Sequence, residues 1–193
     1  MSTAFERGYI LFSQSRYDLA DREFRRELAE DPDNPLAHAF LALCLTERDR
    51  KAEALSEADE AVRLGADEGF NHYVRGRVLC DLDRYKDAEA ATREAIRLDP
   101  DEAGFFGQLS NIAFQRRNWA EALEAANQGL ALDPENTGCT NLRAMALVQL
   151  GRKDEAAQTL GSALADDPEN ALTHANQGWA LLHQGNHTLA LEH

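Results

Sequence analysis

Small and large apolar residues recur along the chain at a fixed interval of 34 residues. One column of the repeat is always alanine: Ala20, Ala54, Ala88, Ala122, Ala156 and Ala190. A second column is always small: Gly8, Ala42, Gly76, Ser110, Ala144 and Gly178. Between these columns, apolar residues fall into two stretches per interval with helical spacing, separated by a short polar turn. The pattern therefore predicts two amphipathic helices in every interval.

Asp-Pro pairs mark where most of these intervals close. The prolines stand at 32, 100, 134 and 168, and at the missing position Gly65 ends the helix in their place. The chain thus divides into five full units, residues 1–34, 35–68, 69–102, 103–136 and 137–170, and a partial sixth, 171–193. A helical hairpin of this size cannot bury its apolar face alone, so neighbouring hairpins must stack. Small residues in register mark where the helices approach closely.

The 34-residue period, the alternating small and apolar columns, the closing Asp-Pro and an aromatic residue in the turn (Tyr17, Tyr85, Trp119) together resemble the tetratricopeptide repeat (TPR) family. The resemblance covers essentially the whole chain, with five units in register. It implies an all-α fold, a right-handed α-solenoid of stacked antiparallel helix pairs that forms one domain over residues 1–193. A protein that binds other proteins without catalysing a reaction is the function it implies.

The sequence departs from the family pattern in three columns. The family's tryptophan is replaced by Ala4, His38, His72, Phe106, Thr140 and His174. Arg7, Arg75 and Arg143 replace a common leucine, and Glu27 replaces a small residue. We expect Glu27 to mark a more exposed first unit.

Charge and composition exclude several other classes of protein. The formal net charge is −14, which disfavours nucleic acid and anionic membranes as partners. The longest apolar run, residues 39–45, is far too short to cross a bilayer. Three dispersed cysteines (Cys44, Cys80, Cys139) and the absence of a signal-peptide core indicate a cytoplasmic protein with reduced thiols.

No arrangement of residues predicts a catalytic site, a cofactor or a metal ion. His38 and His72 lie one repeat apart, but no further ligand completes a tetrahedral zinc set. His183 and His187 are separated by the predicted turn. The acidic segments that begin at Asp31 and its repeats lack the glycine and glutamate of a calcium loop. They are expected to favour the amino ends of the following helices.

In the resembled family, the first helix of each unit lines a concave groove that binds an extended peptide or a partner's helix. Transferring those columns gives ten candidate partner-binding residues: Phe5, Tyr9, Phe12, Phe70, Tyr73, Arg77, Asn111, Gln115, Asn141 and Gln149. The second unit adds only Ala39 and Leu43. The first half of the predicted groove is aromatic, which suits apolar anchors, and the second half is rich in amides, which can pair with a peptide backbone. The family's carboxylate-binding clamp of two lysines, two asparagines and an arginine is matched only at Asn111, so such a clamp is not expected here.

The leading hypothesis is a non-enzymatic scaffold that binds a protein partner in this groove. Two alternatives stay open: the substrate-recruiting arm of a longer enzyme such as a glycosyltransferase, and the soluble part of a membrane-anchored assembly factor. Because the sixth unit is incomplete, we expect the chain to be cut from a longer protein, whether Leu191-Glu192-His193 is native or a tag. The uncapped Trp179, Leu181 and Leu182 then predict end-to-end self-association.

Overall fold

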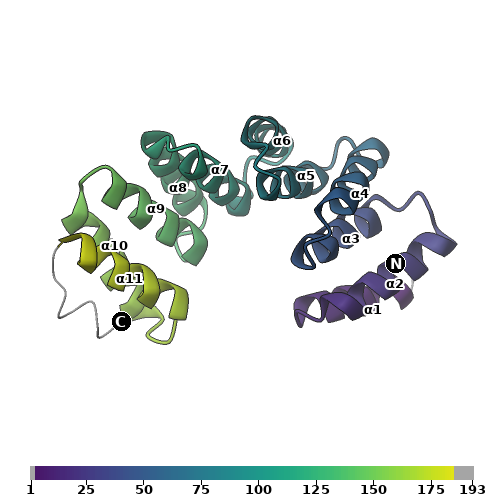
Figure 1. Cartoon of the computed structure of the whole chain (residues 1–193), viewed down its shortest axis with the longest axis horizontal. Coiled ribbons are helices and arrows are strands. Elements are labelled where there is room, and N and C mark those ends of the chain that lie inside the picture. The colour runs from purple at the N-terminus through teal and green to yellow at the C-terminus, as the bar shows by residue number, and fades with distance from the viewer. Residues whose placement is uncertain (1–2, 185–193) are drawn as a thin grey trace. The chain divides into compact units, whose positions relative to one another are not determined.

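The computed structural model describes residues 3–184, and over that range its regular structure is helical (Figure 1). The helices are α1 (Thr3–Ser13), α2 (Tyr17–Glu30), α3 (Pro35–Glu47), α4 (Lys51–Leu64), α5 (Gly69–Asp81), α6 (Tyr85–Leu98), α7 (Ala103–Gln115), α8 (Trp119–Leu132), α9 (Thr137–Gln149), α10 (Lys153–Asp166) and α11 (Ala171–Gln184). Their bounds follow the predicted pattern of two helices per 34 residues.

The helices gather into two compact units, unit 1 (Met1–Pro100) and unit 2 (Asp101–His193). In unit 1 the hairpins α1–α2, α3–α4 and α5–α6 stack, with α3 packed on both α1 and α5. In unit 2 the hairpins α7–α8 and α9–α10 stack in the same way, and α11 packs on α9 and α10. The predicted solenoid of stacked helix pairs is confirmed. Its extension as a single domain over residues 1–193 stays a prediction.

The turn inside each hairpin depends on one residue with left-handed backbone geometry. These residues recur every 34 positions: Ser15, Asp49, Asp83 and Arg117 have φ between 56° and 60°, and Gly151 has φ of 78°. In each turn the backbone N–H of the residue that follows donates a hydrogen bond to the carbonyl oxygen five residues before it, at 2.9 Å. This hydrogen bond ends the first helix of the hairpin. Four of the five turns thus adopt this geometry without the glycine that usually signals it.

Asparagine side chains cap four of the described helices, and three of these helices, α3, α9 and α11, follow an Asp-Pro segment. Asn34, Asn136 and Asn170 each accept a hydrogen bond from the backbone N–H three residues further on, at 3.1, 3.0 and 2.9 Å. The acidic residues stabilise the turn that precedes the helix. Asp133 and Asp167 each accept a hydrogen bond from the backbone N–H two residues later, within that turn. The expected capping by acidic side chains is therefore wrong for α3, α9 and α11, because asparagine occupies the capping position. Their expected interaction with the helix dipole stays a prediction.

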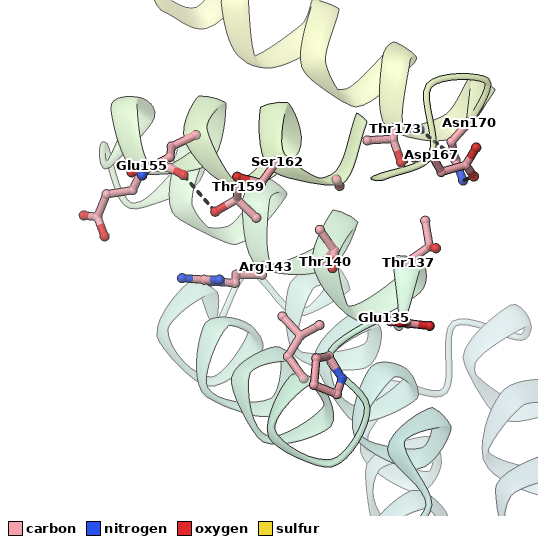
Figure 2. Close-up of a pocket in the computed structure, with 14 residues that line it drawn as sticks. Glu135, Thr137, Thr140, Arg143, Glu155, Thr159, Ser162, Asp167, Asn170 and Thr173 are labelled. Atoms are coloured by element: carbon pink, nitrogen blue, oxygen red, sulfur yellow. Dashed lines mark hydrogen bonds between the residues drawn. The ribbon is translucent and has the colours of Figure 1, made fainter. Parts of the chain in front are cut away.

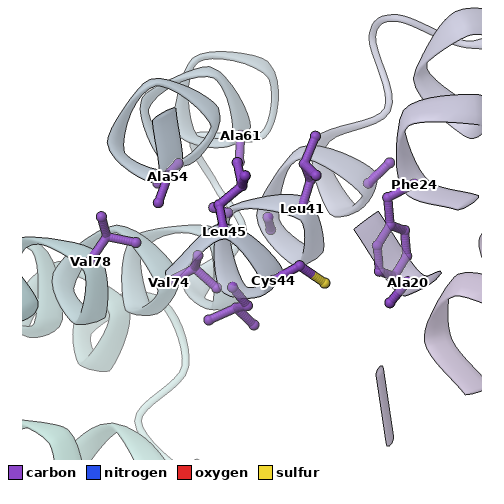
Figure 3. Packing of buried hydrophobic residues seen from close by; sticks show 14 of the residues in the cluster. Ala20, Phe24, Leu41, Cys44, Leu45, Ala54, Ala61, Val74 and Val78 are labelled. Atoms are coloured by element: carbon purple, nitrogen blue, oxygen red, sulfur yellow. The ribbon is translucent and has the colours of Figure 1, made fainter. Parts of the chain in front are cut away.

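The small columns lie at the helix contacts, as predicted. The alanines at 20, 54, 88, 122 and 156 are fully buried, and Ala190 lies outside the described residues. Ala20 and Ala54 pack with larger side chains into one cluster drawn from α1 to α5, part of which Figure 3 shows. Fully buried large residues fill the rest of both units: Phe24, Leu41, Leu45, Val74, Val78, Leu79, Ile112, Leu147 and Leu160.

Two carboxylates of α2 are buried as well. Glu27 is only 3% exposed, so the expectation of a more exposed first unit is wrong at this position. The physical reason is a hydrogen bond, because the Asn34 amide donates to its Oε1 at 3.1 Å. Asp21 is equally buried and is held by the guanidinium groups of Arg25 and Arg48.

Candidate functional site

A row of aromatic rings runs across α1, α3 and α5, the first helices of three successive hairpins in unit 1. Tyr9 meets Phe40 edge-on with ring centroids 5.4 Å apart, Phe40 lies 5.3 Å from Phe70, and Phe70 stacks on Tyr73 at 6.1 Å. Tyr9 is 52% exposed, whereas the other three rings are half-buried. We call Tyr9, Phe40, Phe70 and Tyr73 the aromatic row.

Phe40 joins this row to the core. Its ring also contacts Phe5 and Phe12 edge-on and stacks on the fully buried Phe24 at 5.5 Å. Sequence reasoning missed Phe40 as a surface residue, since the family columns pointed to Ala39 and Leu43, which are both buried. Its aromatic character beside two smaller apolar residues is the one signal that could have found it. Of the predicted groove residues, Phe12 is half-buried, whereas Phe5 is 4% exposed and belongs to the core.

Arg77 lies on α5 and reaches back to α3, where its guanidinium forms an ion pair with Glu47. Both side chains are about one-third exposed, so the pair is solvated. The arginine is therefore already neutralised by the protein itself. A ligand carboxylate would have to compete with Glu47 for it.

The four predicted amide positions of unit 2 fall into two groups. Gln115 and Gln149 are exposed at the ends of α7 and α9, and Asn111 is half-buried. Asn141 is only 3% exposed, and its amide donates to the Thr173 hydroxyl of α11 at 3.4 Å. Asn141 is thus engaged between helices, and the partner-binding role of all ten predicted residues stays a prediction.

Unit 2 also contains a polar pocket of about 920 Å³ that sequence reasoning did not find (Figure 2). Figure 2 shows Thr140 and Arg143 of α9 on one side of it and Thr159 and Ser162 of α10 on the other. None of the ten predicted groove residues lines it. Its lining residues are Leu130, Pro134, Glu135, Thr137, Thr140, Arg143, Glu155, Gln158, Thr159, Ser162, Ala163, Asp167, Asn170 and Thr173.

His38 has its own partners in unit 1. Its Nδ1 lies 2.6 Å from Glu57 Oε2, and its Nε2 donates to the Pro32 carbonyl oxygen at 3.0 Å. Burial alone would lower the pKa of His38, but these hydrogen bonds and the negative charge of Glu57 outweigh it and raise the pKa above 6.5. Across residues 3–184 no three metal-ligating side chains come together.

The repeat pattern can now be compared with known proteins. A sequence model of the tetratricopeptide repeat matches residues 5–69, 73–137 and 141–193, which is nearly the whole chain. The chain belongs to the tetratricopeptide repeat family. Proteins of this family generally act as scaffolds for other proteins. No curated protein matches the sequence.

Solved structures show how closely this TPR chain follows the family's fold. A thermophilic TPR protein of Thermus thermophilus superposes with a TM-score of 0.84 at 23% identity, covering 93% of this chain and 97% of that one. Pseudomonas aeruginosa pilF gives 0.80 at 20% identity over 98% and 86% of the two chains. YrrB, described as a TPR protein with an unusual peptide-binding site, gives 0.63 at 22% identity over 88% and 87%. These similarities establish the fold.

No helix within residues 3–184 of this TPR chain is both long and apolar enough to span a membrane. The cytoplasmic location stays a prediction. The predicted end-to-end association depends partly on residues 185–193, which lie outside the described range. Of the three side chains it invoked, Leu181 is buried, Trp179 is half-buried and Leu182 is 49% exposed.

Proposed function

We propose that this TPR protein is a non-enzymatic scaffold whose aromatic row in unit 1 binds the apolar side chains of a partner's peptide segment. The observation that carries the proposal is the row itself, with Tyr9 at its exposed end. Rings that pack edge to face restrict one another's motion. Binding a ligand therefore costs little further side-chain entropy of the protein. Exposed tyrosine anchored on a rigid base is typical of residues that dominate binding energy.

The partner segment we propose is apolar at its centre and basic at its flanks. The formal net charge of −14 gives the protein a negative field, which accelerates the approach of a basic segment and slows that of an acidic one. Arg77, already paired with Glu47, does not reverse this preference. YrrB, a relative by fold, is described as having a peptide-binding site.

In unit 2 the amides of Asn111, Gln115 and Gln149 support a second, backbone-directed contact. An amide side chain can donate to a peptide carbonyl and accept from a peptide N–H at once. We include these three residues in the proposal and leave Asn141 out, because it is buried and bonded to Thr173.

The proposal is tested by selecting peptides from a random library on the whole chain and measuring their affinities for variants by fluorescence anisotropy. Tyr9→Ala combined with Tyr73→Ala should weaken binding about thirtyfold or more, the effect of losing a dominant contact of about 2 kcal/mol. Ile10→Ala is the matched control, because Ile10 is apolar, adjacent and 54% exposed but lies outside the row. It should change affinity by less than about threefold.

Circular dichroism of the double variant separates a binding effect from unfolding. Its helical signal should match that of the wild type, since Tyr9 is 52% exposed and Tyr73 is only half-buried. Selected peptides that bind the double variant as tightly as the wild type would refute the aromatic row as the site. Selection of acidic rather than basic peptides would refute the proposed partner chemistry.

A further inference from the structure

Arg143 differs from the other partly buried arginines of the protein. Arg50, Arg75 and Arg77 are also half-buried, and each forms an ion pair with a carboxylate at the protein surface. Arg143 forms none with any residue in the range 3–184, and its Nε is shielded from solvent without an acceptor. A shielded cationic N–H group without a partner costs free energy that an anionic ligand would recover.

The repeat register explains why this arginine is unpaired. Arg75, two repeats earlier, donates from Nε to Asp59 Oδ1 at 2.6 Å, across to the preceding hairpin. The residue that corresponds to Asp59 for Arg143 is Asn127, which is neutral. Glu155 also lines the pocket, and the hydrogen bonds from Arg152, helped by the positive charge of Arg143, lower its pKa. Both of its oxygens are bound by Arg152 at 2.7 Å, so it forms no ion pair with Arg143.

The same register explains why there is space in front of Arg143. Thr140 occupies a column that holds histidine or phenylalanine in the described helices α3, α5, α7 and α11. There the rings of His72 and His174 reach a carbonyl of the preceding loop at 2.9 Å. The shorter threonine cannot fill that volume, so a pocket opens beside the arginine.

A second column removes charge from the opposite wall. Ser162 of α10 corresponds to Glu60 and Glu94, which bind Arg63 and Arg97 on their own helices. The serine leaves a small hydroxyl facing the pocket in place of a carboxylate. On this wall a hydroxyl that can donate a hydrogen bond therefore replaces a carboxylate that can only accept one.

We propose that this pocket binds a single carboxylate group, with the Arg143 guanidinium as its cationic partner and the hydroxyls of Thr140 and Ser162 as further donors. The planar guanidinium fits a carboxylate through two parallel hydrogen bonds. Glu135, Glu155 and Asp167 also line the pocket, so a group with one negative charge is favoured over a doubly charged phosphate. The carboxylate can come from an acidic side chain, a peptide carboxyl terminus or a small organic acid.

The test is a titration of the whole chain followed by the NMR signal of the Arg143 Nε–H. Three probes carry a carboxylate: blocked Ala-Glu-Ala, acetylated Ala-Ala-Ala with a free carboxyl terminus, and propionate. Blocked Ala-Gln-Ala and inorganic phosphate are the controls. At least one carboxylate probe should change the chemical shift of this signal to saturation. The controls should bind at least about tenfold more weakly, or not at all. The tightest of the three identifies the source of the carboxylate.

Asn127→Asp is the decisive variant, because it restores the internal partner that Arg75 has and alters one exposed side-chain group. It should weaken binding of the carboxylate probes at least tenfold while Arg143 remains in place. Asp59→Asn is the matched control, because it removes the partner of Arg75. Two repeats before Thr140 and Ser162 the chain has His72 and Glu94, so freeing Arg75 there should create no carboxylate site and should leave probe binding unchanged. Equal binding to wild type and Asn127→Asp, or no saturating shift from any carboxylate probe, would overturn the proposal.

Discussion

Replacing Gly8 by alanine should destabilise unit 1, although alanine is the better helix former. A Cβ at this position would lie 2.8 Å from Phe24 Cε1 and 3.0 Å from two further ring atoms. Carbon atoms normally pack about 3.5–4.0 Å apart. The ring cannot easily retreat, because Phe24 is fully buried, with Phe5 against it at 5.6 Å and Phe40 stacked on it at 5.5 Å.

The size of the effect follows from two opposing contributions. Forcing an extra methyl group into a packed core costs about 1–3 kcal/mol. Alanine in place of glycine within a helix stabilises the folded protein by about 1 kcal/mol. Gly8→Ala should therefore lower the free energy of unfolding by up to about 2 kcal/mol. In a Phe24→Leu background the ring is gone, and the same substitution should raise it by about 0.5–1 kcal/mol. The change of sign is the signature of direct contact.

The chain carries its own reporters for this measurement. All four tyrosines lie in unit 1 and both tryptophans lie in unit 2: Tyr9, Tyr17, Tyr73, Tyr85, Trp119 and Trp179. Urea unfolding is followed by tyrosine second-derivative absorbance for unit 1 and by tryptophan fluorescence for unit 2. A stabilising effect of Gly8→Ala in the wild-type background, or the same effect with phenylalanine and with leucine at residue 24, would refute the reasoning.

Two further predictions concern titratable groups. Since the pKa of His38 is raised above 6.5, its stabilising contribution is complete below 6.5 and lost as the pH rises through the folded value. Urea unfolding at pH 6 and 8 should show a larger loss for wild type than for Glu57→Ala, and equal losses would contradict this. Burial raises the pKa of Cys44 to about 12 and those of Cys80 and Cys139 to about 11. A thiol reagent at pH 8 should therefore react slowly with the native protein and quickly in urea, and fast native reaction would contradict it.

The helices and their stacking were predictable from the sequence because a repeat repeats its contacts. Each alanine from 20 to 156 occupies the same kind of helix crossing, so five weak signals reinforce one another. Glu27 broke its column, and burial of its carboxylate depends on Asn34, a partner that no column identifies. Comparing equivalent positions of the repeats therefore predicts packing contacts that every repeat shares. It does not predict a side-chain pair that occurs in one repeat alone.

The candidate sites were less predictable for the same reason. The concave columns selected Tyr9, which is exposed, and Phe5, which is buried in the core, and they missed Phe40. Whether a ring is a surface or a core residue depends on how neighbouring helices fill the space around it. The pocket of unit 2 is recognisable only when Arg143 and Asn127 are compared with their counterparts two repeats earlier.

The two proposed sites can be tested independently because hairpins in a solenoid contact mainly their neighbours. The aromatic row is built from α1, α3 and α5 of unit 1, and the pocket is lined from α8 through α11 of unit 2. Tyr9→Ala with Tyr73→Ala should consequently leave the Arg143 titration with carboxylate probes unchanged. Asn127→Asp should likewise leave the affinity of selected apolar peptides unchanged. If either variant weakened both interactions, the two sites would be coupled, and the independence expected of hairpins that contact mainly their neighbours would be wrong.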